Sequence, residues 1–80
     1  MSDFNLELDT SGLNCPLPVL KARKALSGMS AGERLHLIAT DMGAKQDIPA
    51  FCKMTENPLI ELTENTDTLS FIIEKGQDNG

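Results

Sequence analysis

The sequence predicts an α/β protein of the α+β kind: a two-layer sandwich with element order βαβαββ, in which two helices lie on one face of a mixed four-stranded sheet. Two observations support this class: the order in which the predicted strands and helices follow one another, and the residue pattern within the strands. Every predicted strand alternates apolar and polar residues, whereas a parallel sheet covered on both faces shows continuous apolar runs. One face of the sheet is therefore solvated, and right-handed crossovers place both helices on the other.

Four segments carry the alternation of a half-buried strand, and the third and fourth are joined by the hairpin signal Asn65-Thr66-Asp67. We expect every second residue of each strand to face the helices. The residues expected on that face are Phe4, Leu6 and Leu8 in the first strand, Leu35, Leu37 and Ala39 in the second, Ile60 and Leu62 in the third, and Leu69, Phe71 and Ile73 in the fourth.

The two predicted helices, from Pro16 to about Met29 and from about Ala44 to Thr55, each carry one apolar stripe. In the second helix Asp47 stands two residues before Pro49, which predicts that Asp47 caps the first turn. The alternative is that Pro49 kinks a helix that begins earlier. The stripes are Val19, Ala22, Ala25, Leu26 and Met29 in the first helix, and Ala44, Ile48, Phe51 and Cys52 in the second, which predicts a core position for Cys52.

Length and composition exclude several classes of protein. Eighty residues allow one domain, 1–80, with a short disordered tail from about residue 76. The net charge of −5 and the absence of Trp and Tyr argue against direct, strong binding of nucleic acid. The chain has no signal peptide pattern and no apolar run near the ~20 residues that span a membrane. Two cysteines suit a reducing compartment, so we expect a cytoplasmic protein.

The segment Cys15-Pro16-Leu17-Pro18 lies where the first strand gives way to the first helix. Pro16 and Pro18 suit positions N1 and N3, because the first-turn amides lack helical partners. Cys15 is then the N-cap, with its sulfur beside the free amides of Leu17 and Val19 at the positive end of the helix dipole. Helix N-termini lower the pKa of cysteine, so this position favours a thiolate. We predict a functional thiol, although free cysteines are more often small buried hydrophobes.

A second face of the same helix combines basic and apolar residues. Leu17 and Leu20 fall outside the apolar stripe, and Lys21, Arg23 and Lys24 lie on or beside the same face. We predict that this surface, next to the thiol, docks partner proteins. The alternative is that the basic side chains only solvate the outer face of the helix.

Other residues are weaker candidates for a site. Strand parity places His36, the one histidine, on the open face of the sheet, where an exposed structural role is expected. The spacings of the cysteines and this histidine form no zinc signature, and no Gly-rich phosphate loop is present, so we expect no metal and no cofactor. Asp41 and Asp47 flank the entry to the second helix and, with Cys52, are secondary candidates.

Several short segments, spread over nearly the whole chain, match the pattern of one protein family. They are Leu8-Asp9, Gly12-Leu13, Cys15-Pro16-Leu17-Pro18, Arg23-Lys24, Asp41, Asp47-Ile48-Pro49 and Phe51-Cys52. On these residues, from about Leu6 to Lys75, the chain resembles the TusA/SirA-like sulfur carriers. The resemblance implies a βαβαββ fold and a sulfurtransferase in which Cys15 carries sulfane sulfur as a persulfide.

The resemblance also implies the partners: a cysteine desulfurase or rhodanese-like donor, and a downstream relay protein that leads to tRNA 2-thiouridine, molybdenum cofactor assembly or sulfur oxidation. Members that thiolate tRNA typically have an acidic residue where this chain has Leu17, so the acceptor stays open. Two other functions also stay open: a redox module with a disulfide between Cys15 and Cys52, and a regulatory interaction domain. The protein is expected to be a monomer or, through Leu17 and Leu20, a weak dimer.

Overall fold

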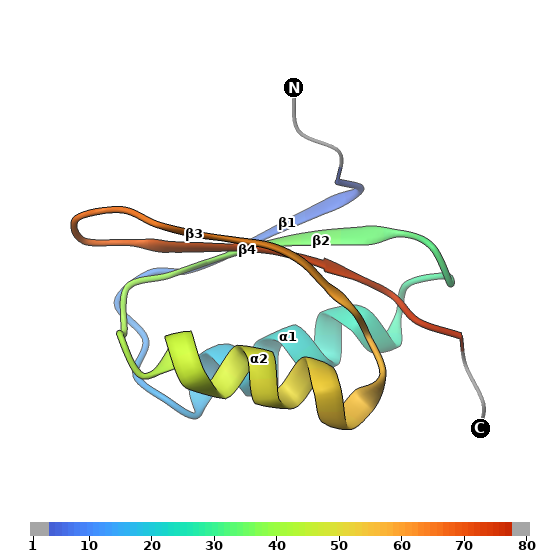
Figure 1. Ribbon diagram of the computed structural model, residues 1–80, viewed down its shortest axis with the longest axis horizontal. Coiled ribbons are helices and arrows are strands. Elements are labelled where there is room, and N and C mark those ends of the chain that lie inside the picture. The colour runs from blue at the N-terminus through green and yellow to red at the C-terminus, as the bar shows by residue number, and fades with distance from the viewer. Residues whose placement is uncertain (1–3, 78–80) are drawn as a thin grey trace.

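The computed structural model describes residues 4–77, which form a four-stranded sheet with both helices packed on one face (Figure 1). The strand order is β1-β2-β4-β3, with β1 parallel to β2 and both other pairs antiparallel. The predicted fold class is confirmed, and the second helix has the predicted bounds. The elements are β1 (Leu6–Thr10), α1 (Leu17–Ser27), β2 (Arg34–Ala39), α2 (Ala44–Thr55), β3 (Leu59–Glu64) and β4 (Leu69–Glu74).

The core lies between the helices and the two central strands, β2 and β4. Both strands alternate strictly between buried and half-buried residues, as the sequence predicts. Leu37 lies opposite Phe71 and Leu35 opposite Ile73, so apolar pairs line the covered face. The helical stripes meet them as predicted. The buried helix residues are Pro18, Ala22 and Leu26 of α1 and Ala44, Ile48, Phe51 and Cys52 of α2, while Val19, Ala25 and Met29 are partly buried against the core.

The predicted alternation of the first strand is wrong for Phe4, the first residue assigned to it. The strand begins at Leu6, and the ring of Phe4 lies 4.9 Å from the ring of His36. His36 is on the open face of the sheet, so Phe4 lies there too and not with Leu6 and Leu8. Because β1 is an edge strand, Leu6 is exposed and Leu8 only partly buried.

The third strand also departs from its predicted pattern, because it contains a β-bulge. Leu59 is opposite Ile73 and Glu61 is opposite Ile72, so Ile60 is the extra residue. Leu59, rather than Ile60, packs against the core. Both residues that the alternation placed inside are exposed: Ile60 at the bulge, and Leu62 because β3 is the other edge of the sheet.

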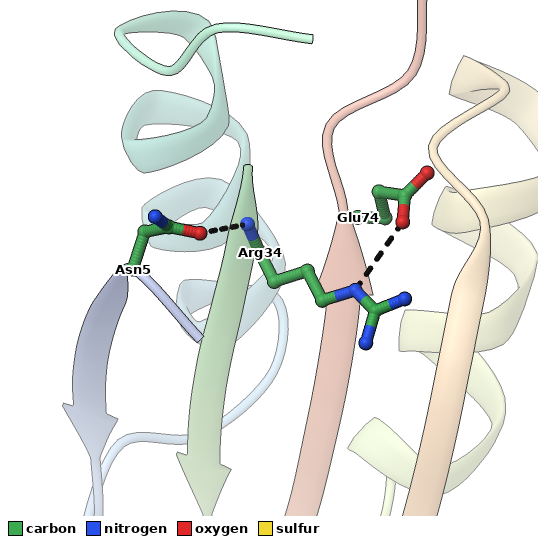
Figure 2. A network of polar contacts seen from close by, with 3 residues as sticks. All are labelled: Asn5, Arg34 and Glu74. Carbon is green, nitrogen blue, oxygen red and sulfur yellow. Dashed lines mark hydrogen bonds and ion pairs between the residues drawn. The ribbon is translucent and has the colours of Figure 1, made fainter. Parts of the chain in front are cut away.

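Polar contacts connect three chain segments near the amino end of β2 (Figure 2). The Oδ1 atom of Asn5 accepts a hydrogen bond from the amide of Arg34 at 2.9 Å. The Nε atom of Arg34 pairs with Oε1 of Glu74 at 3.2 Å, directly across the β2–β4 ladder. Both charged side chains are about one third exposed. Such a pair contributes at most about 1 kcal/mol, so it supports the strand register more than the overall stability.

The chain after β4 remains attached to the fold at Gly76. Its amide donates a 2.8 Å hydrogen bond to Oδ1 of Asn57, a buried side chain that also donates to Oγ1 of Thr55 at 2.9 Å. Gly76 is therefore held by the fold through its amide. Residues 78–80 of the predicted disordered tail lie outside the described residues, so that tail stays a prediction.

Replacing Asn57 with alanine is expected to lower the free energy of unfolding by about 1–2 kcal/mol, because it leaves the partly buried amide of Gly76 without its acceptor. Urea denaturation followed by circular dichroism measures the change. The control is Asn65→Ala, which removes only an exposed 3.5 Å contact to Thr68 and should change stability by less than about 0.5 kcal/mol. Equal losses in the two variants would contradict this role of Asn57.

Candidate functional site

The site forms where the carboxyl ends of two parallel neighbours, β1 and β2, meet at one edge of the sheet. The loop after β1 is joined to the loop after β2 by two hydrogen bonds. The amide of Gly12 donates to Oγ1 of Thr40 at 2.8 Å, and the amide of Cys15 donates to Oδ2 of Asp41 at 2.8 Å. The position of Cys15 is therefore fixed by a residue that lies 26 positions later in the chain.

The first helix begins one residue later than the sequence predicts. Pro16 is its N-cap and Cys15 lies outside it, joined to Pro16 by a cis peptide bond. The amide of Leu17 donates to the carbonyl of Asn14 at 2.9 Å, so it is not free to face a sulfur. Pro18 is buried in the core rather than placed beside the thiol. The prediction that Cys15 caps α1 is wrong.

The sulfur lies instead at the start of α2, whose N-cap is Gly43. A Cβ atom on Gly43 would lie 3.3 Å from Sγ of Cys15 and 3.3 Å from Oδ2 of Asp41. The glycine therefore lets both side chains approach the backbone closely. Asp47 stands in the first turn of α2, on the side of this helix start that acts on the Cys15 thiol and raises its pKa.

This environment favours the thiol over the thiolate, contrary to the prediction. The hydrogen bond to Asp47, burial, and the hydrogen bond and negative charge of Asp41 together raise the pKa of Cys15 to about 12. The same contacts act in the opposite direction on the carboxylate: hydrogen bonds from the thiol and amide of Cys15, and from the amide of Gly43, lower the pKa of Asp41. The sequence reasoning considered only the neighbours of Cys15 in α1, and these charges come from Asp41 and Asp47, which lie much later in the chain.

The predicted role of Asp47 as a helix cap is also wrong. The second helix begins at Ala44, and no side chain caps it by a hydrogen bond. Pro49 lies inside this helix, so the alternative of a helix that begins before Asp47 is confirmed. Asp47 therefore lies inside the first turn of α2 rather than before it.

The predicted docking face of α1 is exposed as expected, including Leu17, Leu20, Lys21, Arg23 and Lys24. The sequence analysis did not predict the groove that lies beside this face. A groove of about 350 Å³ runs between the two helices and is lined by Val19, Leu20, Arg23, Phe51, Met54 and Thr55.

Met54 is the residue on this surface that sequence reasoning missed. Met54 is 78% exposed, the highest value among the large apolar residues in the part of the chain that the structure describes. The sequence pattern indicates this exposure, because Met54 falls outside the apolar stripe of its helix, as Leu20 does in α1. An exposed apolar residue on each of two adjacent helices marks one continuous surface.

Cys52 and His36 lie apart from this site. Cys52 is 3% exposed within the core, as predicted, and burial raises the pKa of its thiol to about 11. Both cysteines are free, and the burial of Cys52 disfavours its use as a disulfide partner. His36 is half-buried on the open face, where Nε2 contacts Oγ of Ser70 at 2.6 Å and Nδ1 contacts Oε1 of Glu7 at 3.3 Å.

The fold and site define a small α/β protein with one accessible thiol beside two carboxylates. The model of the family described as "Sulfurtransferase TusA" matches residues 6–75. The chain is 53% identical over 75 residues to the sulfur carrier protein TusA of Allochromatium vinosum, covering 94% of this chain and 99% of that protein. The chain belongs to the TusA family.

A second relative agrees with this assignment, and a solved structure agrees with the fold. The sulfur carrier protein TusA of Pseudomonas putida is 38% identical over 80 residues, covering 98% of this chain and all of that protein. The crystal structure of a SirA-like protein from Desulfitobacterium hafniense superposes with a TM-score of 0.79 at 21% identity, covering 91% of this chain and 100% of the other, and supports the fold. Among the helices in residues 4–77, neither is long and apolar enough to cross a membrane.

Proposed function

We propose that this member of the TusA family is a sulfur carrier in which Cys15 holds the transferred sulfur as a persulfide. The observation that carries the proposal is the position of Cys15. It is partly exposed at the edge of the sheet and held by Asp41, whereas Cys52 is buried in the core. Only one of the two thiols can therefore meet the sulfur of another protein without unfolding.

The transfer is a thiol exchange and needs no cofactor. The Cys15 thiolate attacks the outer sulfur of a donor persulfide, a new S–S bond forms on Cys15, and the S–S bond of the donor breaks. The donor leaves as a thiolate and takes up the proton that Cys15 gave up, so oxidation states balance between the two proteins. The reverse exchange, with an acceptor thiolate attacking the outer sulfur on Cys15, delivers the cargo. This makes the protein a sulfurtransferase that acts as a persulfide carrier.

We propose that the surface beside the thiol selects the partner proteins. Leu17 and Leu20 offer apolar contact, Lys21, Arg23 and Lys24 offer positive charge, and Met54 extends this surface across the interhelical groove. In an otherwise acidic protein, this positive face would attract acidic surfaces and set the orientation of encounter. The alternative that these basic residues only solvate α1 predicts no effect of their removal on transfer.

The expected donor is a cysteine desulfurase or a rhodanese-like protein, and the expected acceptor is a sulfur-relay protein. Leu17 at the variable position of the Cys-Pro-x-Pro motif leaves the final acceptor open among tRNA thiolation, molybdenum cofactor assembly and sulfur oxidation. We place the protein in the cytoplasm, where reducing conditions keep thiols free. Residues 1–80 act as one carrier domain, as a monomer or weak dimer.

Incubation with a cysteine desulfurase and cysteine is expected to add the mass of one sulfur atom to the protein, on the peptide that contains Cys15. The gain should be absent in Cys15→Ala and present in Cys52→Ala, because the second thiol is buried. Mass spectrometry of the intact protein and of its peptides measures both. A gain that persists in Cys15→Ala would overturn the proposal, and full function of Cys15→Ser in cells would favour a non-catalytic interaction domain.

A further inference from the structure

Charge is divided between the two layers of the fold. The two helices carry five basic residues and one acidic residue, whereas the four strands carry five acidic residues and one basic residue. The net charge of −5 therefore hides a basic helical layer and an acidic sheet (Figure 1). The charged residues are Lys21, Arg23, Lys24, Lys45, Lys53 and Asp47 in the helices, and Glu7, Asp9, Glu61, Glu64, Glu74 and Arg34 in the strands.

The outer side of the helices is basic, and most of its charges have no partner within the fold. Lys45 pairs with Glu64 at 2.8 Å, but the other four basic residues of the helices are exposed and form no ion pair within residues 4–77. Leu20 of α1 and Met54 of α2 are exposed on the same side, where both line the groove between the helices. We call this surface the helical face, and its residues are Leu20, Lys21, Arg23, Lys24, Lys53 and Met54.

The side of the sheet that the helices leave uncovered has the opposite charge. Its apolar residues, Ile38 and Ile72, lie half-buried on the central strands β2 and β4. The edge strands add exposed carboxylates: Asp9 of β1 is beside Ile38, and Glu61 of β3 is beside Ile72. The basic residue of this side, Arg34, already pairs with a carboxylate of β4. We call this surface the open face, and its residues are Glu7, Asp9, His36, Ile38, Glu61 and Ile72.

The two faces match in pattern, charge and size. Each has apolar residues among charged ones, and the charges of the two faces have opposite sign. The molecule extends 35 × 28 × 17 Å, with the layers stacked along the middle dimension in Figure 1, so each face measures about 35 by 17 Å. Two faces of this size in contact bury at most on the order of 1,200 Å², which is at the low end for a specific complex. A contact between them is therefore weak and reversible.

We propose that the helical face of one copy of this chain docks on the open face of a second copy, head to tail. Lysines and the arginine of one copy then meet the carboxylates of the other, and Leu20 and Met54 meet Ile38 and Ile72. Two copies of net charge −5 repel each other at a distance, but physiological salt screens charges farther apart than about 8 Å and weakens contacts between touching faces much less. Each copy keeps one face free, so short chains form at high concentration.

This pairing has a consequence for sulfur transfer, which rests on the proposed function of Cys15. The helical face overlaps the surface that we propose selects the partner proteins. A docked copy covers that surface, so paired carriers are withheld from donors and acceptors until they dissociate.

Sedimentation velocity at increasing protein concentration tests the pairing, with a reducing agent present to exclude disulfide-linked dimers. The sedimentation coefficient is expected to rise with concentration. Lys24→Glu and Glu61→Lys should each lower the association constant at least about tenfold, because each brings like charges into contact. The matched control is Asp67→Lys, which changes the net charge by as much as Glu61→Lys but lies in the β3–β4 connection, and it should not weaken association. All three residues are exposed, and circular dichroism checks that the variants are folded.

An equimolar mixture of Lys24→Glu and Glu61→Lys should regain association, because the first variant keeps its open face and the second keeps its helical face. Both variants remain net negative, so attraction between opposite net charges does not explain such a recovery.

Three results contradict the proposal: a protein that stays monomeric at every concentration, equal association of Glu61→Lys and Asp67→Lys, or association that only Lys24→Glu weakens. The last result indicates a helix-to-helix dimer through Leu17 and Leu20 instead. These measurements contain no sulfur donor. A chain that pairs as expected but never gains sulfur on Cys15 therefore contradicts the proposed function and leaves the pairing standing.

Discussion

Replacing Phe71 with alanine is expected to remove about 3–5 kcal/mol of stability, a large part of the roughly 4–12 kcal/mol that an 80-residue domain possesses. Phe71 is fully buried in the central strand β4, opposite Leu37 of β2, and is the largest of the fully buried side chains. Its removal leaves a cavity in the core on the covered face of the sheet, and a domain of this size has few other contacts with which to compensate. Urea denaturation at neutral pH measures the loss.

The adjacent residue provides the matched control. Ile72 points to the open face of the same strand and is only half-buried, so Ile72→Ala is expected to cost less than about 1.5 kcal/mol. The two substituted residues are neighbours in β4, and their side chains lie on opposite faces of the sheet. Comparable losses in both would mean that the open face contributes to the core as much as the covered one, contrary to this fold.

Raising the pH above 9 is expected to destabilise the protein through Cys15. In the unfolded chain the thiol loses its proton near 9.0, whereas in the folded protein the carboxylates and burial hold it until about 12. The contribution of this raised pKa is complete below pH 9 and is lost as the pH rises to 12. In that window the free energy of unfolding falls by at most about 1.4 kcal/mol per pH unit from this group.

The effect of Cys15 can be separated from other groups that titrate in the same range. Cys52 has its pKa raised to about 11 and acts with the same sign, so the comparison is between Cys52→Ala and Cys15→Ser/Cys52→Ala. Lysine titration is common to both, and the chain has no tyrosine. Urea unfolding at a series of pH values should show a steeper alkaline decline when Cys15 is present. Parallel curves would contradict the raised pKa.

The core and the secondary structure were predictable because they depend on local periodicity. Strict alternation in β2 and β4 identified the residues that face the helices, and the stripe of α2 identified Cys52 as buried. The same reasoning failed at the sheet edges. The bulge at Ile60 inserts one residue into the period of β3, and a pattern of apolar and polar residues carries no mark of such an insertion.

From its sequence alone, the protein is predicted to carry an accessible thiol, Cys15, after the first strand, and Leu17 and Leu20 are predicted to lie outside the core. The sequence did not determine the charge state of that thiol. Local reasoning assigned the sulfur to the N-terminus of the nearest helix, α1, and therefore predicted a thiolate. The structure places the sulfur at Gly43, where α2 begins.

Only the tertiary structure could decide this, because the relevant neighbours are distant in the chain. Parallel pairing of β1 with β2 aligns their carboxyl ends, so the loop that carries Cys15 meets the loop that carries Asp41. A pKa depends on the charges within a few ångströms, whichever residues supply them. The motif thus fixes the place of Cys15 in the chain, and the strand pairing fixes which residues surround its sulfur.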